Sequence, residues 1–232
     1  MTGNCWEFRQ CRLARMHIQR RRALLKLAAG IGLPAVLGHA LAQTSAKQGV
    51  RTVQGDMRIN GKPAEAGTVV RPGDTIVLAN GALATFVVGQ DAFLMRGGSH
   101  AELIGSGVLV SALQLVTGKL LGVFGSGGER RLVTSTATIG IRGTGAYIEA
   151  EPRRTYFCLC YGTAEVTATM GGARESFSTR HHDSPRYIYG DGRGRAIAPA
   201  SVANHTDSEL ILLESLVGRS PPQSFMESPV RY

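Results

Sequence analysis

Short runs of alternating apolar and polar residues occupy the chain from Gly49 to Ile104, and turn residues separate them. Dipeptides such as Asn60-Gly61 and Asn80-Gly81 are typical of tight turns between strands. These turn signals recur about every eight to twelve residues, which indicates an all-β sandwich, barrel or solenoid. The clearest runs are 50–53, 57–59, 75–78, 82–88 and 93–96.

The stretch 109–124 is apolar almost throughout. Its β-branched residues, together with Gly118 and Gly122, favour two buried strands, and a short helix over 111–116 is the alternative. The segment 125–131 that follows combines glycines with charged residues. We expect it to form a flexible, exposed loop.

A helix is predicted at 207–217, because Thr206 and Glu209 have the spacing of a capping box and Gly218 suits the C-terminal end. We expect this helix to cover one end of the β-domain, or alternatively to bind a partner, and we expect a loose tail after Ser220. The predicted organisation is an N-terminal extension with an export signal, a linker, a β-domain, a helical segment and a tail, at 1–42, 43–48, 49–200, 201–220 and 221–232.

The N-terminal region resembles a twin-arginine export signal. Arg21 and Arg22 precede an apolar stretch, and Ala40 and Ala42 fit the small-residue rule for cleavage before Gln43. A retained anchor is the alternative, but 27–42 is shorter than the roughly 20 residues that span a bilayer. We therefore expect a periplasmic protein with no stable membrane span after signal cleavage.

The positive charge of the chain is concentrated in this N-terminal region. The formal net charge is +9, of which +6 lies in residues 1–42, so the rest of the chain carries only +3. No basic stripe with interleaved aromatic residues appears in the rest, so we expect no nucleic-acid partner.

The segment Val133–Glu149 reads as two strands joined at a Gly-rich corner, formed by Gly140, Arg142, Gly143, Thr144 and Gly145. It lacks the Gly-Lys-Ser/Thr of a phosphate loop. The glycines suit unusual backbone conformations and close chain approach. We expect Arg142 to be buried and paired and to hold the corner together, with ligand contact as the alternative.

This corner resembles the signature of the FecR domain, a bacterial periplasmic module known from iron-uptake signalling. Other matching stretches extend the resemblance over roughly 49–170: Val53-Gln54-Gly55, Arg71-Pro72-Gly73-Asp74-Thr75-Ile76, 84–88 and 161–166. The resemblance implies a β-solenoid or double-stranded β-helix, with a sandwich as the alternative. It also implies a non-enzymatic role in envelope signalling or protein–protein interaction, with an envelope protein as partner.

The family's signalling members carry a cytoplasmic segment and a membrane span before the domain. This chain departs from that plan, because its N-terminal region is expected to be cleaved. We therefore do not expect this chain to act as a direct regulator in the way that those family members do.

Candidate chemistry lies at Cys158 and Cys160, which project from the same face if they lie on one strand. His181 and His182 follow after a predicted hairpin turn at Gly171-Gly172, and at most one of them can join the thiols. Two thiolates and one imidazole could bind zinc or copper, and haem ligation is a further possibility. We expect instead that the thiols pack as small apolar groups, that the histidines are solvated and that the chain has no cofactor, with the metal or haem site as the alternative.

No nucleophile elbow or His-Glu-x-x-His motif is present in the sequence. Glu149 and Glu151 are expected at a solvated strand end rather than as a glycosidase pair. We therefore expect no enzyme, and a hydrolase of envelope polymers is the least favoured class.

Overall fold

The computed structural model describes residues 47–192 and 194–227. The predicted signal residues Arg21, Arg22, Ala40 and Ala42 lie outside this part. Within it, no helix combines the length and the apolar character that a membrane crossing requires.

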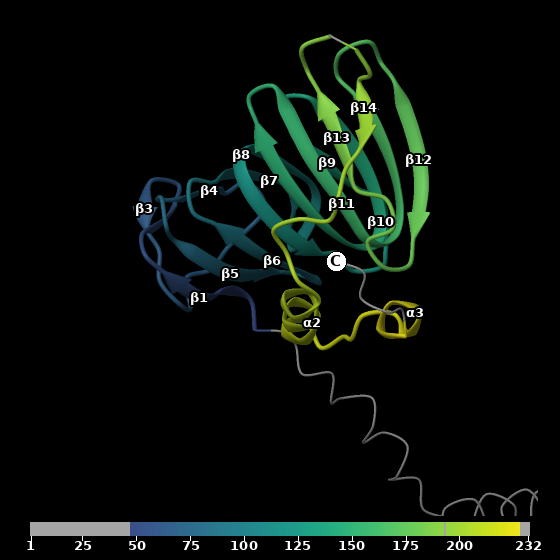
Figure 1. Cartoon of the computed structure of the whole chain (residues 1–232). Helices are drawn as coiled ribbons and strands as arrows, with labels where there is room; N and C mark the ends of the chain where they lie inside the picture. Colours follow the sequence, from purple (N-terminus) through teal and green to yellow (C-terminus); the bar gives the residue numbers. More distant parts are fainter. Residues whose placement is uncertain (1–46, 193, 228–232) are drawn as a thin grey trace, which may run out of the picture. The chain divides into compact units, whose positions relative to one another are not determined.

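The all-β class with a C-terminal helix is confirmed (Figure 1). The strands form one open sheet, in which every pairing is antiparallel except that of β8 with β9. This open sheet stands in place of the parallel coils of a solenoid or the two sheets of a sandwich. The strands are β1 Gly49–Gln54, β2 Met57–Ile59, β3 Lys62–Pro63, β4 Thr75–Leu78, β5 Leu83–Val88, β6 Asp91–Arg96, β7 His100–Ser106, β8 Leu109–Val123, β9 Arg130–Val133, β10 Ala137–Glu151, β11 Arg154–Ala168, β12 Arg174–Thr179, β13 Arg186–Tyr189 and β14 Ile197–Pro199.

Strand β8 corrects the expectation of two strands or a helix at 109–124, because it is one strand of 15 residues. Its first part pairs with β7, and its last part pairs with β6 and β10. Gly118 lies where the partners change, with a φ of +97°. A Cβ atom there would come within 2.5 Å of Ser99. The glycine therefore bends the strand and does not end it.

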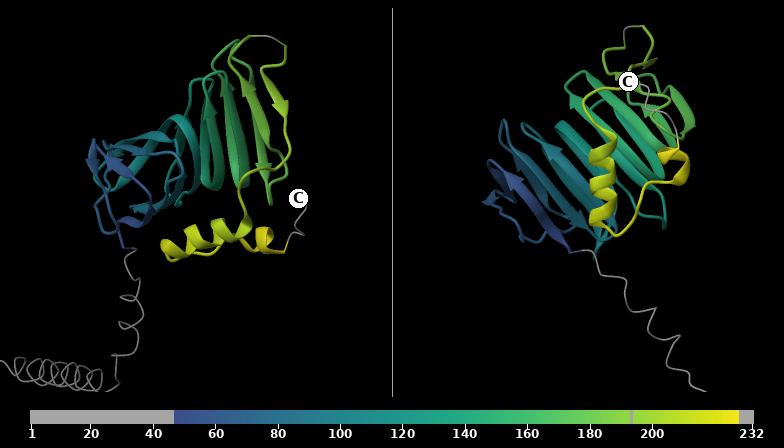
Figure 2. Two further views of the ribbon diagram at one scale, coloured as in Figure 1. Left: turned by 60° about the vertical axis from the view of Figure 1, so that its left-hand side comes forward. Right: turned by 60° about the horizontal axis from the view of Figure 1, so that its bottom comes forward.

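The sheet buries apolar side chains on both faces around its centre. In β11, Phe157 and Leu159 belong to one core, and Cys158 and Cys160 belong to the other. The first core lies entirely among residues of the sheet and its connections. The second core is completed by the C-terminal strap, which we define as residues 201–226 and which lies beside the strands in Figure 2.

The strap contains the helices α2, Asp207–Leu216, and α3, Gln223–Met226. The capping box of Thr206 and Glu209 is formed as the sequence indicates, and Gly218 has a φ of +70° just beyond the helix. The expected loose tail after Ser220 is wrong over α3, because Phe225 is buried against Tyr161 and His181. Pro221 is buried as well, so this segment packs on the β-domain.

The expected exposed loop at 125–131 is wrong for its last two residues, which begin β9. Arg130 is buried and its Nε lies 3.3 Å from a carboxylate oxygen of Asp91, which is buried as well. The other oxygen of Asp91 accepts a hydrogen bond from the N–H of Gly125 at 2.8 Å. A buried ion pair therefore fastens this Gly-rich segment to β6.

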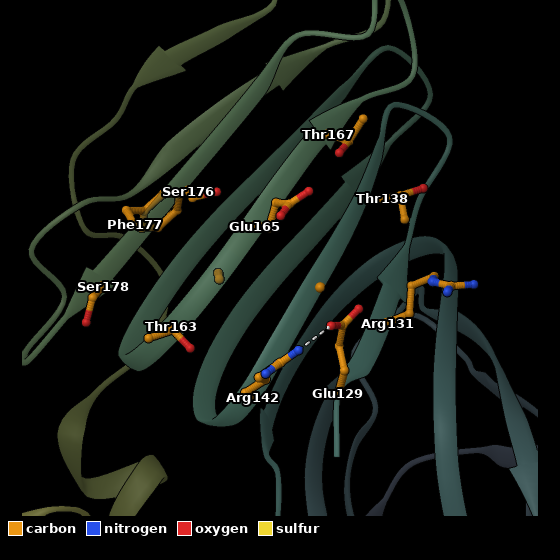
Figure 3. Close-up of a pocket in the computed structure, with 12 residues that line it drawn as sticks. Glu129, Arg131, Thr138, Arg142, Thr163, Glu165, Thr167, Ser176, Phe177 and Ser178 are labelled. Carbon is orange, nitrogen blue, oxygen red and sulfur yellow. Dashed lines mark hydrogen bonds and ion pairs between the residues drawn. The ribbon is translucent and has the colours of Figure 1, made fainter.

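The expected corner at Gly140–Gly145 is a β-bulge inside the continuous strand β10, whose register against β11 shifts between Arg142 and Ala146. Arg142 alternates with the buried Ile139 and Ile141 and therefore faces outward. Its side chain is 73% exposed and pairs with Glu129 at 3.3 Å (Figure 3). The expected burial of Arg142 is thus wrong, and its partner is an exposed carboxylate.

Figure 3 also shows the groove in which Arg142 lies, on the outward face of β9 to β12. Most of its lining is exposed and polar, with hydroxyl groups such as Thr163 and Ser176 and a carboxylate at Glu165. No cysteine or histidine lines it. The groove holds none of the predicted metal ligands.

We expect Gly145→Val to lower the free energy of unfolding by about 1–3 kcal/mol, the usual effect of overpacking a core. A Cβ atom at Gly145 would lie 2.6 Å from the ring of Tyr161 and 3.0 Å from Leu210. Arg142→Ala is the matched control from the same bulge, with an expected effect within about 0.5 kcal/mol. Urea unfolding of both variants measures these losses. Equal losses of unfolding free energy in the two variants would contradict the view that Gly145, and not Arg142, is needed for packing at the bulge.

Candidate metal centre

The two cysteines lie on β11 and face the second core, as their spacing predicted. Both side chains are fully buried, and neither forms a disulfide bond. The Sγ of Cys160 lies 3.8 Å from the carbonyl oxygen of Cys158. Their strand is held between β10 and its other neighbours, with Cys158 opposite Tyr147. The sheet therefore fixes both sulfur atoms.

His182 joins them from the loop that follows β12. That strand pairs with β11 as far as Thr179, and the N–H of His182 donates to the carbonyl of Cys160 at 3.0 Å. His182 has a φ of +51°, in the left-handed region that few non-glycine residues adopt. This turn of the backbone places its Nδ1 3.4 Å from the Sγ of Cys158.

The sequence reasoning missed the fourth member, His205, which comes from the strap. Its Nε2 lies 3.1 Å from the Nδ1 of His182. The four donor atoms of Cys158, Cys160, His182 and His205 all lie within 4.8 Å of one another, and all four residues are buried. The available signal was that His205 immediately precedes the helix cap, in a segment expected to pack on the β-domain.

Hydrogen bonds on the far side of each imidazole assign its tautomer. The Nδ1 of His205 faces the carbonyl oxygen of Ala203 at 2.7 Å, and the Nε2 of His182 faces a carboxylate oxygen of Asp207 at 3.0 Å. Both partners only accept, so these nitrogens carry the protons. When both rings are neutral, the nitrogens that face each other across the centre both carry lone pairs, and a cation between the donors, either a proton or a metal ion, satisfies them.

His181 does not join this group. Its Nε2 pairs with the second carboxylate oxygen of Asp207 at 2.9 Å, and its ring packs against Phe225. Asp207, in the first turn of α2, therefore holds both adjacent histidines. Such a carboxylate behind a histidine orients the ring and increases the basicity of its inward nitrogen.

The pKa values of the two thiols are shifted in opposite directions. Burial opposes ionisation of Cys158, but hydrogen bonds from Cys160, His182 and His205 hold its pKa well below the usual value. Burial and the neighbouring Cys158 raise the pKa of Cys160 well above it. Although burial lowers the pKa of His182, Cys158 and Asp207 raise it above its ordinary value. The surroundings of Cys158 and His182 thus favour a positive charge in the centre.

The donor spacing suits one small tetrahedral ion. Zinc bonds of about 2.3 Å to sulfur and 2.0–2.1 Å to nitrogen place neighbouring donors roughly 3.3–3.8 Å apart. The observed separations of 3.4 Å and 3.1 Å are close to that range. Four donors clustered so closely leave no room for a porphyrin among them, so the residues do not fit haem.

The order Cys158–His182–Asp207 also has the form of a nucleophile, a base and an orienting carboxylate. Its sulfur is fully buried, and the grooves found on the described surface are lined by other residues. A triad would moreover leave Cys160 and His205 without a role. A metal ion gives a role to all five residues.

Comparison with known proteins adds little at this distance. No protein-family model matches the chain, and no curated protein matches its sequence. Two crystal structures of a candidate anti-sigma factor from Parabacteroides distasonis align with TM-scores of 0.46 and 0.45, at 9% and 10% identity. Each alignment covers 55% of this chain and 59% of that protein. A likeness this distant carries no argument about function, and membership of the FecR family stays a prediction.

Proposed function

We propose that this chain binds one zinc ion through Cys158, Cys160, His182 and His205, as a closed structural site. The observation that carries the proposal is the pair of inward imidazole nitrogens, 3.1 Å apart beside two buried sulfur atoms. Two-cysteine, two-histidine sets are a common form of structural zinc site. A cation at the centre would satisfy both lone pairs and the thiolate charge together.

The coordination set argues for a structural ion. A catalytic zinc ion has three protein ligands and keeps one position open for water or substrate. Here the protein supplies four donors within 4.8 Å of one another, and all four residues are at most 6% exposed. We therefore propose a non-enzymatic protein. Copper(I) shares the preference for sulfur, and zinc is favoured because the set contains two imidazoles in a tetrahedral arrangement.

The proposed periplasmic location is compatible with this ion. Exported proteins meet an oxidising environment, in which cysteines usually form disulfide bonds. Cysteines two apart on one strand would form a strained disulfide, because the sulfur atoms of a bond need a specific geometry. A bound metal ion would explain how two thiols persist in such a compartment.

Elemental analysis of the purified full chain tests the proposal. Cys5→Ser and Cys11→Ser are included, so that Cys158 and Cys160 are the only thiols. We expect one zinc ion per chain under reducing conditions, and its loss in Cys160→Ser and in His205→Ala. His100→Gln, outside the centre, is the matched control and retains the metal. No bound metal, together with rapid alkylation of Cys158, would favour a thiol nucleophile and overturn the zinc site.

The resemblance to the FecR domain favours a second, compatible role, which is binding of an envelope protein in signalling. This proposed role rests on the sequence motifs alone. Cross-linking in intact cells, followed by identification of the attached proteins, tests this role. Recovery of the chain without any envelope protein would count against it.

A further inference from the structure

We propose that the metal ion locks the C-terminal strap onto the sheet, and that its removal frees residues 201–226 while the sheet stays folded. The inference rests on the proposed zinc site and adds a regulated movement to it. It follows from where the four donors lie in the chain and from what else holds the strap.

The donors are divided between two bodies. Cys158 and Cys160 belong to β11, and His182 lies in the loop bonded to that strand through the carbonyl of Cys160. His205 alone comes from the strap. An ion bound to all four is therefore a cross-link between strap and sheet. Asp207 strengthens the link, because it belongs to the strap and holds both His181 and His182.

The other attachments of the strap are a small apolar patch and a set of polar contacts. Leu210, Leu213 and Phe225 are buried in the second core. Polar contacts supplement them: Arg96 pairs with Glu209 at 2.9 Å, Asn204 donates to Glu149 at 2.6 Å, and the hydroxyl of Tyr161 donates to Glu214. Hydrogen bonds to charged groups such as these contribute roughly 1.5–3 kcal/mol each. Helix α2 has 10 residues, too few for a helix to persist alone in water. The strap is therefore ordered by docking, and a lost cross-link weakens all of it.

Without the ion, strain falls on the strap side of the centre. The Nδ1 of His182 then lies 3.1 Å from the Nε2 of His205 and 3.4 Å from the Sγ of Cys158, with no ion between them. Cys158 and Cys160 cannot withdraw, because hydrogen bonds to neighbouring strands hold β11. Movement of His205 relieves this close contact. Because His205 directly precedes the N-cap Thr206, the first turn of α2 moves as well.

The sheet does not need the strap for its own core. The first core includes Phe157, Leu159 and Ile148, and no buried residue in it comes from 201–226. Undocking would uncover the second core, with Leu94, Leu121 and Tyr156 among its members. Metal release would therefore convert a covered apolar face into an exposed one without unfolding the sheet.

Hydrogen exchange of the full chain with Cys5→Ser and Cys11→Ser tests the lock, with zinc bound and after chelation. We expect the amides of α2 to exchange about 5- to 150-fold faster without zinc, the range typical of coupling between two sites. After chelation, the amides of Ala146 to Ala150 in β10 should stay much better protected than those of α2, because the sheet remains folded. Because coupling is reciprocal, Leu213→Ala should weaken zinc binding, and Leu103→Ala in the first core should not.

The outcomes separate the two proposals. Absence of zinc from the purified protein would overturn the zinc site itself. Bound zinc with unchanged exchange in α2 after chelation would overturn only the lock. Equally low protection of α2 and β10 after chelation would also overturn the lock, because strap and sheet would then open together.

Discussion

Zinc added to the metal-free protein is expected to raise the free energy of unfolding by about 4 kcal/mol when the free ion is a thousandfold above its Kd. The reason is mass action, since the four donors converge only in the folded chain. For a protein of this size, 1 kcal/mol shifts the melting temperature by roughly 2–4 °C. Thermal unfolding in zinc buffers should therefore show a rise of about 8–16 °C.

Two variants give this result its specificity. Cys160→Ser removes a donor from the sheet and His205→Ala removes the donor of the strap, so both should melt at the same temperature with and without zinc. Arg142→Ala, whose side chain is exposed, should keep the full response. A zinc response in Cys160→Ser equal to that of the unaltered protein would contradict the assigned ligands.

Asp91→Ala is expected to lower the free energy of unfolding by about 3–5 kcal/mol, because it leaves Arg130 charged and unpaired in the core. A guanidinium group cannot lose its proton to escape this state. Replacing both residues, as in Asp91→Leu with Arg130→Met, should restore most of the stability. Urea unfolding of the single and double variants checks the interaction. Equal losses in both would contradict a dominant role for the unpaired charge.

The companion variant Arg130→Met has a smaller expected effect with a distinct pH dependence. Burial raises the pKa of Asp91, while Gly125 and Arg130 lower it, so loss of Arg130 raises it further. A carboxyl group with a raised folded-state pKa stabilises the fold at pH values below its unfolded pKa, and this contribution is lost as pH rises through the folded pKa. Relative to the unaltered protein, Arg130→Met should thus be less destabilised near pH 4 than at pH 7. Zinc-free samples at both pH values isolate this effect from metal binding.

Local signals in the sequence predicted the local structure well. Helix α2 follows its capping box, and the period of two put Cys158 and Cys160 on one face of β11. Each of these features depends on residues close together in the chain, so a pattern can reveal them.

Contacts between distant segments escaped the sequence reasoning. His205 reaches the centre from 45 positions after Cys160, through the docking of the strap. Arg130 lies in a segment whose glycines suggest exposure, and its partner Asp91 is on another strand. The bulge at Arg142 resembled a corner because glycines allow both conformations, and only pairing with β11 decides between them.

X-ray absorption at the zinc edge tests the central claim most directly, using the purified full chain with Cys5→Ser and Cys11→Ser. We expect the zinc ion to have two sulfur neighbours at about 2.3 Å and two nitrogen neighbours at about 2.0–2.1 Å. A shell of nitrogen and oxygen atoms alone would contradict the account, because it would place the ion away from Cys158 and Cys160.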